Sequence, residues 1–434
     1  LGTSYGYGFL FTGQADYNEI TDCVISLSPS TTNSYNIGIC ASSTGSYSSY
    51  GNHGNYNLIK DNTINSGYYG ICLNGSSSSS TTQSVGNQFI GNTVQDFYYY
   101  GMYLYYSAQI KVQDNYVRQR SSGTVTTSSG YGIYVYYPND GPVVTGNYTE
   151  AHYNPMRVYR INNSYTSSAN RGLVANNRLV GIGTSTMYGL YVSYAAYADI
   201  VYNSVNLFNN TSTCYGLYEY GQSSAYNVKV TNNYIAYDGN GTFYPVYNYY
   251  YESQTQFDYN AFWHVGSGSE QWRWDGTTYT SLSSLKSSVP AYHQNTVEGN
   301  PYFVAQNDLH SRSHVGYQAG TPVTVVTDDM DGDPRSTTMP CIGADEYPAP
   351  PPEYDVAVAK VRWDYATDRW AHREGTSSHE VRVLIESVGI LQDIPQVTLV
   401  YKVGSAPADI ADGVAQTFSP SWATGPAVMT FSQP

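Results

Sequence analysis

The chain has 434 residues, more than one compact domain usually holds. Charged residues make up only 12% of it, against roughly 25% in an ordinary soluble protein, whereas tyrosine occurs 49 times. The formal net charge of −14 argues against nucleic acid and against an anionic membrane surface as partners, because both require clustered Lys and Arg. No stretch approaches the roughly 18 apolar residues of a membrane span, so we expect none in this chain.

A repeated motif runs through the first 262 residues. It consists of an apolar residue, two residues of any type, an Asn, one residue of any type and a second apolar residue. The Asn positions are Asn62, Asn92, Asn115, Asn147, Asn177, Asn203, Asn233 and Asn260, and a ninth copy has Cys23 in their place. A second marker, usually Tyr-Gly as in Tyr100-Gly101, keeps step with the first. Nine markers in each series predict nine coils.

These repeats predict an all-β fold, a right-handed parallel β-helix of about nine coils over residues 1–262. Each repeat carries short runs of β-branched and aromatic residues, which favour strands, and none has a helical period of useful length. One repeat has too little apolar surface to fold alone, so neighbouring repeats must stack at roughly 4.8 Å per coil. Stacking places the Asn residues above one another, and we expect an internal ladder in which each side-chain amide bonds the next.

Alternation after each Tyr-Gly marker predicts which side chains face outward. Met102 and Leu104 are expected inside, as are the equivalent pairs Ile133 with Val135 and Leu190 with Val192. The first outward column is Leu10, Cys40, Cys72, Tyr103, Tyr134, Arg157, Tyr191, Tyr218 and Tyr247, and the second is Thr12, Ser42, Asn74, Tyr105, Tyr136, Tyr159, Ser193, Tyr220 and Tyr249. Large exposed aromatic patches usually mark contacts, and flat aromatic arrays stack on sugars or form protein interfaces. We therefore expect the tyrosines of both columns to form a binding surface.

The pattern stops after Phe262, and three further regions follow. Residues 263–347 are expected to cap the solenoid, since they carry the bulky set Trp272, Trp274, Tyr279, Leu282 and Leu285. Residues 348–353 form a stiff, Pro-rich linker. Residues 354–434 alternate as sandwich strands do and predict an immunoglobulin-like β-sandwich, which we expect to be incomplete.

Two motifs at the end of the cap carry a resemblance. They are Asp329-Met330-Asp331-Gly332-Asp333-Pro334-Arg335 and Ile342-Gly343-Ala344-Asp345-Glu346-Tyr347. With them, residues 1–348 resemble secreted bacterial right-handed β-helix surface proteins, pectate-lyase-like solenoids that end in such a segment. Asp355-Val356-Ala357-Val358 and Ile385-Glu386-Ser387-Val388-Gly389 resemble adhesion-type immunoglobulin-like modules. The resemblance implies a secreted or cell-surface location but little about activity, because the family is functionally mixed and the wider superfamily includes polysaccharide lyases.

One irregular coil carries a cluster of ionisable groups. Arg157 interrupts the first outward column, and Glu150, His152 and Arg160 are its neighbours in the sequence. A lyase would use a Lys or Arg base beside acidic residues that hold calcium or neutralise a uronate. In the structural interpretation Arg157 stacks on neighbouring tyrosines. We favour the structural interpretation, because no acidic cluster lies on the adjacent outward columns, and keep a lyase site as the alternative.

Asp329, Asp331 and Asp333 alternate as at the start of a calcium loop. Pro340 occupies the twelfth position, where an EF-hand requires Glu, so an EF-hand is excluded. We expect a hydrogen-bonded turn, with calcium bound in another geometry as the alternative and no other cofactor. The sequence has neither a Gly-x-Ser-x-Gly elbow nor a recognisable Cys and His arrangement for nucleophilic catalysis.

Cys40 and Cys72 occupy the same outward column in adjacent coils. Their Cα atoms are expected roughly 5 Å apart, within the range that a disulfide tolerates. An extracellular location favours oxidation, so we expect a disulfide, with two stacked thiols as the alternative.

Together these features predict a non-enzymatic extracellular or cell-surface scaffold. Its Tyr-rich face would contact a protein subunit, another copy of the chain or an extracellular glycan. The alternative is a polysaccharide lyase or glycan-binding enzyme with its site near Arg157.

Overall fold

The computed structural model describes residues 6–44, 47–51, 54–76, 83–162, 170–220, 227–249, 255–350 and five strands beyond them. It divides into two compact units, Leu1–Pro348 and Ala349–Pro434. We describe each unit by itself.

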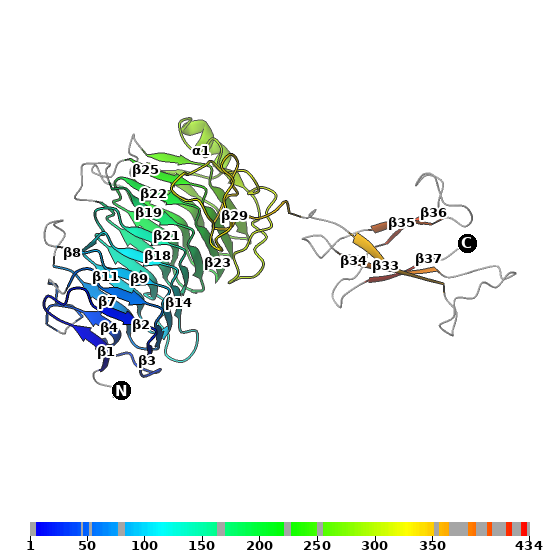
Figure 1. The fold of residues 1–434 in the computed structure, drawn as a ribbon. Coiled ribbons are helices and arrows are strands. Elements are labelled where there is room, and N and C mark those ends of the chain that lie inside the picture. Colours follow the sequence, from blue (N-terminus) through cyan, green and yellow to red (C-terminus); the bar gives the residue numbers. More distant parts are fainter. Residues whose placement is uncertain are drawn as a thin grey trace. The chain divides into compact units, whose positions relative to one another are not determined.

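Three parallel sheets form the first unit (Figure 1). Sheet 1 contains β1 (Gly6–Phe11), β4 (Asn36–Ala41), β7 (Tyr69–Asn74), β11 (Tyr100–Tyr105), β15 (Tyr131–Tyr136), β18 (Asn154–Tyr159), β21 (Met187–Ser193), β24 (Cys214–Tyr220), β27 (Phe243–Asn248), β30 (Trp272–Trp274) and the antiparallel β31 (Thr277–Tyr279). Sheet 2 contains β2 (Glu19–Thr21), β5 (Leu58–Lys60), β9 (Gln88–Ile90), β13 (Lys111–Gln113), β16 (Val143–Thr145), β19 (Gly172–Ala175), β22 (Ala198–Val201), β25 (Val228–Thr231) and β28 (Gln256–Asp258). Sheet 3 contains β3 (Val24–Ser26), β6 (Thr63–Asn65), β10 (Thr93–Phe97), β14 (Tyr116–Gln119), β17 (Tyr148–Ala151), β20 (Arg178–Gly181), β23 (Ser204–Asn210), β26 (Tyr234–Gly239), β29 (Ala261–Val265) and β32 (Val297–Glu298). Two short strands, β8 (Ser84–Val85) and β12 (Ser107–Ala108), pair in parallel and form a separate two-stranded sheet.

The architecture is a parallel β-solenoid, as the repeats predict. The nine strands of sheet 2 are joined by eight steps, so the chain completes about eight turns. The nine predicted coils therefore correspond to nine stacked layers rather than to nine full turns.

The Asn ladder lies inside the turn between sheets 2 and 3. Asn147 Nδ2 donates to Asn177 Oδ1 at 2.9 Å, and Asn177 Nδ2 donates to Asn203 Oδ1 at 2.9 Å. The same bond links every neighbouring pair from Asn62 to Asn260. Each amide also donates to a strand carbonyl, as Asn177 does to Val144 O. These side chains are buried and satisfied, which confirms their structural role.

The interior is filled by the residues that alternation assigns to it. Met102, Leu104 and their equivalents in the other coils belong to one continuous buried cluster. The Gly of the Tyr-Gly marker is required by close packing: a Cβ atom at Gly101 would lie 2.2 Å from Val117 Cγ1 and 2.7 Å from the Gly132 carbonyl oxygen. The start of β11 therefore admits no side chain at this position.

Aromatic residues and one helix close the end of the solenoid that follows the last coil. Trp272 and Trp274 on β30 are buried, and they pack with Leu282 and Leu285 on α1 (Leu282–Ser288) in the main core. Ser281 caps α1, since its Oγ accepts from the Ser284 N–H at 3.1 Å. No helix within the described residues is long and apolar enough to span a membrane.

Residues 299–347 run back along the outside of the solenoid, in yellow in Figure 1. Val323 and Val326 pack against Val201 and Tyr202, which covers part of sheet 2. The segment also covers sheet 3, where Leu309 packs on Tyr148 and Val180 and where Ile342 packs on Tyr234 and Ala261. Within the predicted cap, residues 263–298 thus close the end, whereas residues 299–347 cover two outer faces.

The second unit contains two antiparallel sheets. One consists of β33 (Val356–Trp363), β34 (Val381–Ser387) and β37 (Ala427–Phe431), and the other of β35 (Val397–Tyr401) and β36 (Val414–Phe418). The rest of residues 351–434 lies outside the described residues, so the immunoglobulin-like assignment stays a prediction.

Candidate interaction surface on the tyrosine face

The outer face of sheet 1 carries both predicted columns in the predicted register. Tyr103 pairs with Tyr134, Tyr134 with Arg157, and Arg157 with Tyr191. The first column continues through Tyr218 and Tyr247. The second aligns Tyr105, Tyr136, Tyr159, Ser193 and Tyr220, and the Tyr249 ring stacks on that of Tyr220. We call this surface the tyrosine face.

A third column belongs to the same face, and alternation alone does not predict it. Gly101 and Met102 both point into the core, so the side chain of Tyr100 returns to the outside. The equivalent positions are Tyr69, Tyr131, Tyr188, Tyr215 and Tyr244. Asn154 interrupts this column. The ring of the preceding residue, Tyr153, fills the gap and contacts the rings of Tyr131 and Tyr188.

The rings stack on one another along the solenoid. The centroids of Tyr218 and Tyr247 are 4.9 Å apart with 8° between the ring planes, and those of Tyr136 and Tyr159 are 5.2 Å apart at 5°. Ring faces that stack on each other are not available to a sugar. Where rings stack, the surface therefore presents ring edges and hydroxyl groups rather than ring faces.

Burial affects the hydroxyl groups of several residues of the tyrosine face. Burial raises the pKa of Tyr105 to about 12, and burial also raises the pKa of Tyr103, Tyr134 and Tyr218 above the usual tyrosine value. The face is more enclosed than the sequence predicts, because each ring covers its neighbours and leaves Tyr134 only 5% exposed. Protonated phenols can donate as well as accept hydrogen bonds.

Three arginines are inserted among these rings. The Arg157 guanidinium lies 4.8 Å from the Tyr134 centroid and 4.1 Å from that of Tyr191. Arg160 and Arg273 contact rings in the same way, at 4.7 Å from Tyr137 and 5.2 Å from Tyr247 respectively. Within the described part of the chain, none of the three forms an ion pair with a carboxylate. The sequence pattern predicts the stacking of Arg157 but gives no signal for Arg273, which lies beyond the last repeat.

The four residues of the alternative lyase site do not share one sheet. Arg157 belongs to β18 of sheet 1 and Arg160 follows it, whereas Glu150 belongs to β17 of sheet 3. Glu150 forms an ion pair with Arg118 at 3.3 Å and accepts a hydrogen bond from the Tyr148 hydroxyl. His152 is buried against Gln119, and burial lowers its pKa. Each of the four therefore has a structural contact of its own.

Cys40 and Cys72 are register partners on β4 and β7, and both are free thiols in the structure. The disulfide between them stays a prediction. The Cα atoms of in-register neighbours on parallel strands lie roughly 4.8 Å apart, which is within the range that a disulfide tolerates. Non-reducing peptide mapping tests for the bridge.

The predicted calcium residues lie in the terminal segment, where Asp329 supports a turn. Its Oδ1 accepts from the Asp331 and Asp333 N–H groups at 2.8 and 2.9 Å, and its Oδ2 accepts from Glu346 N–H. The carboxylates that approach one another are those of Asp329, Asp331 and Asp345, so Asp345 takes the place predicted for Asp333. Backbone donors occupy the Asp329 oxygens, which favours the turn over a cation.

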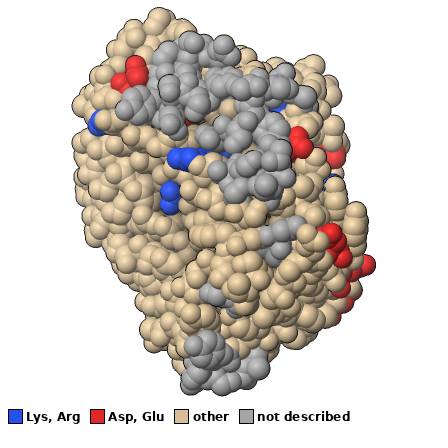
Figure 2. Space-filling model, turned by 90° about the vertical axis from the view of Figure 1, so that its left-hand side faces the viewer, with Lys and Arg blue, Asp and Glu red and all other residues tan. Residues whose placement is uncertain are grey.

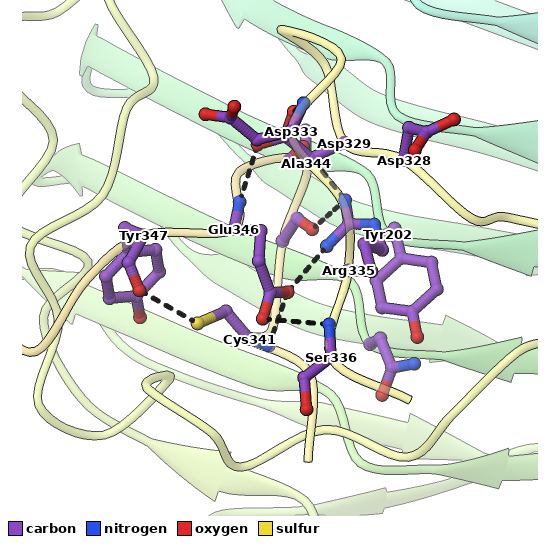
Figure 3. A network of polar contacts seen from close by, with 12 residues as sticks. Tyr202, Asp328, Asp329, Asp333, Arg335, Ser336, Cys341, Ala344, Glu346 and Tyr347 are labelled. Atoms are coloured by element: carbon purple, nitrogen blue, oxygen red, sulfur yellow. Dashed lines mark hydrogen bonds and ion pairs between the residues drawn. The ribbon is translucent and has the colours of Figure 1, made fainter. Parts of the chain in front are cut away.

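Arg335, in the first of the two motifs of this segment, contacts residues of the second motif (Figure 3). The buried guanidinium donates to the Gly343 and Ala344 carbonyl oxygens at 3.1 and 2.9 Å and pairs with Glu346 at 3.4 Å. It also lies 3.9 Å from the Tyr202 ring centroid, on the outside of sheet 2. The motifs thus fasten residues 299–347 to the solenoid.

Figure 2 shows a face of the molecule on which charged side chains are sparse: a few basic groups lie near its middle and acidic groups toward its margins. Comparison of the chain with protein families, curated proteins and solved structures found no match. The class of protein that the fold defines is a parallel β-solenoid with a Tyr-rich surface, and its function has to be argued from that surface.

Proposed function

We propose that this chain is a non-enzymatic extracellular or cell-surface scaffold that holds a partner on its tyrosine face. The observation that supports the proposal most is that three guanidinium groups without a carboxylate partner among the described residues lie between rows of tyrosine rings. Such a surface offers many hydrogen-bond donors and local positive charge on a chain whose net charge is −14.

Of the three partner classes, an extended glycan that carries acidic groups fits this surface best. Arginine binds carboxylates and sulfates through pairs of N–H groups, and phenols donate to hydroxyl and carboxylate oxygens. Layers spaced at roughly 4.8 Å repeat these donors along the solenoid, as an extended polymer requires. A protein subunit or a second copy of the chain would have to present a similarly regular row of acceptors.

The alternative lyase function has weaker support. Lyase chemistry needs a base beside a group that neutralises the uronate. Glu150, the acidic residue of the alternative site, lies on another sheet than Arg157 and has Arg118 as its partner. We therefore retain binding without cleavage as the first proposal, and the secreted location and the immunoglobulin-like module as parts of it.

A binding screen tests the proposal. The whole chain is applied to immobilised carboxylated, sulfated and neutral polysaccharides, and its self-association is measured by sedimentation. We expect retention on the acidic polymers, weaker retention at high salt, and no unsaturated cleavage products. Cleavage that is lost in Arg157→Ala would instead establish the lyase, and self-association without retention would make a second copy the partner.

A further inference from the structure

A pocket lies on the outer face of sheet 2, next to the segment of residues 299–347. Its volume is about 330 Å³, within the range of about 300–1,000 Å³ that small-molecule sites occupy. Residues 322–325 form one wall, and the other consists of residues on β22, β25 and β28 and of the residues immediately before β19 and β25. The pocket therefore belongs to a different sheet from the tyrosine face and is a separate candidate for a ligand.

Arg171, immediately before β19, fixes several of the groups that line the pocket. Its Nε and Nη2 atoms donate to the two carboxylate oxygens of Asp199 at 3.1 and 2.7 Å, and its Nη1 atom donates to Asn227 Oδ1 at 3.0 Å. Nη2 also donates to the backbone carbonyl oxygens of Ala198 and Asn227, at 3.0 and 3.1 Å. These bonds connect three neighbouring layers of the solenoid, and Asp199 balances the charge of Arg171.

Lys229 is the second cation of the pocket, and it is half-buried on β25. It lies in register with Asp199 on β22 and with Gln256 on β28. Asp199 is paired with Arg171, and no carboxylate of the described residues forms an ion pair with Lys229. Two cations and one carboxylate give the pocket a net charge of +1, on a chain whose net charge is −14.

Groups that bind hydroxyl oxygens line the same pocket. Asn227 accepts from Arg171 through its Oδ1 atom, which leaves its Nδ2 group as a donor. Gln256 and Thr324 are exposed, and they supply an amide and a hydroxyl group from opposite walls. An ammonium group accompanied by amide and hydroxyl groups is complementary to a carboxylate with neighbouring hydroxyl groups.

We propose that this pocket binds a small hydroxylated organic acid with one carboxylate, of the kind that a hexuronate represents. The Lys229 ammonium pairs with the carboxylate, and Asn227, Gln256 and Thr324 bind the hydroxyl groups. The same chemistry occurs in a free acid and at the end of an acidic polysaccharide. Because no residue of the tyrosine face takes part, this proposal does not depend on the function proposed above.

Calorimetric titration of the whole chain with glucuronate and with glucose tests the proposal. The two sugars differ only at one carbon, which is a carboxylate in glucuronate and a hydroxymethyl group in glucose. We expect glucuronate to bind at least about tenfold more tightly, because glucose cannot form the ion pair with Lys229. A uronate oligosaccharide, titrated in parallel, identifies the source: tighter binding than glucuronate indicates a polymer end, and equal or weaker binding indicates the free acid.

Three variants locate the site. Lys229→Met removes the charge and should weaken glucuronate binding at least about tenfold. Lys111→Met is the matched control and should bind as the wild type does, because Lys111 is exposed in the same outward column of sheet 2 but does not line the pocket. Thr324→Phe is an exposed change that fills the pocket from the wall of residues 322–325, and it should abolish binding.

The proposal would be overturned if the wild type did not bind glucuronate, or if it bound glucose equally well. Wild-type affinity in Lys229→Met would also overturn it. An equal loss in Lys229→Met and Lys111→Met would do the same, because the attraction would then come from charge anywhere on the sheet. If Lys229→Met does not fold, Thr324→Phe carries the test, and wild-type affinity there has the same consequence.

Discussion

At the scale of the residue, the terminal motifs are explained by one buried cation. Arg335 is 2% exposed at its side chain, and its ring partner Tyr202 and hydrogen-bond partner Asn176 both belong to the solenoid. The sequence indicates that these motifs matter, but it cannot predict that Arg335 binds carbonyl groups eight and nine residues further along the chain. That contact depends on the path of residues 299–347 over sheet 2.

Replacing Arg335 by Met tests this role. We expect the variant to lose about 3–5 kcal/mol in the free energy of unfolding, because Glu346 and two carbonyl groups lose their buried partner. Arg335→Lys should recover little of it, since an ammonium cannot reproduce the planar contact with Tyr202. Arg312→Met, an exposed change in the same segment, is the control in chemical denaturation. Equal stability of the Arg335 and Arg312 variants would contradict the role.

At the scale of the element, the sequence predicts the strands of sheet 1 and their register well. Period-2 alternation assigns Tyr103 and Tyr105 to the outside, and the burial pattern of β11 confirms it. The same rule misplaces Tyr100, because Gly101 and Met102 both face inward and break the alternation. The alternation does not predict how the rings are oriented either, since the orientation depends on which neighbours each ring packs against.

Two substitutions at Tyr218 separate the ring from its hydroxyl group. Tyr218→Phe keeps the stacking with Tyr191 and Tyr247, at 4.6 and 4.9 Å, and should change the free energy of unfolding by no more than about 0.5 kcal/mol. Tyr218→Ala removes the ring and should cost roughly 1–3 kcal/mol through lost burial and stacking. Urea denaturation measures both. A stability loss in Tyr218→Phe as large as that in Tyr218→Ala would show that the hydroxyl group, rather than stacking, holds the column.

At the scale of the whole first unit, the coverage of the sheets singles out the tyrosine face. Residues 263–298 close one end, and residues 299–347 pack on the outer faces of sheets 2 and 3. The cluster on the outer face of sheet 1 contains no described residue of that terminal segment. The repeats predict the solenoid. They do not predict which sheets the terminal segment covers, because that segment has no repeat of its own.

The most direct measurement of the central claim is the affinity of the triple variant Tyr191→Phe, Tyr218→Phe and Tyr247→Phe for the acidic polysaccharide that retains the wild type. The variant keeps every ring of the first column beyond Arg157 and removes only three hydroxyl groups. At about 0.5–1.5 kcal/mol for each lost hydrogen bond, the account predicts an affinity at least about tenfold lower with an unchanged unfolding temperature. An affinity equal to that of the wild type would contradict it.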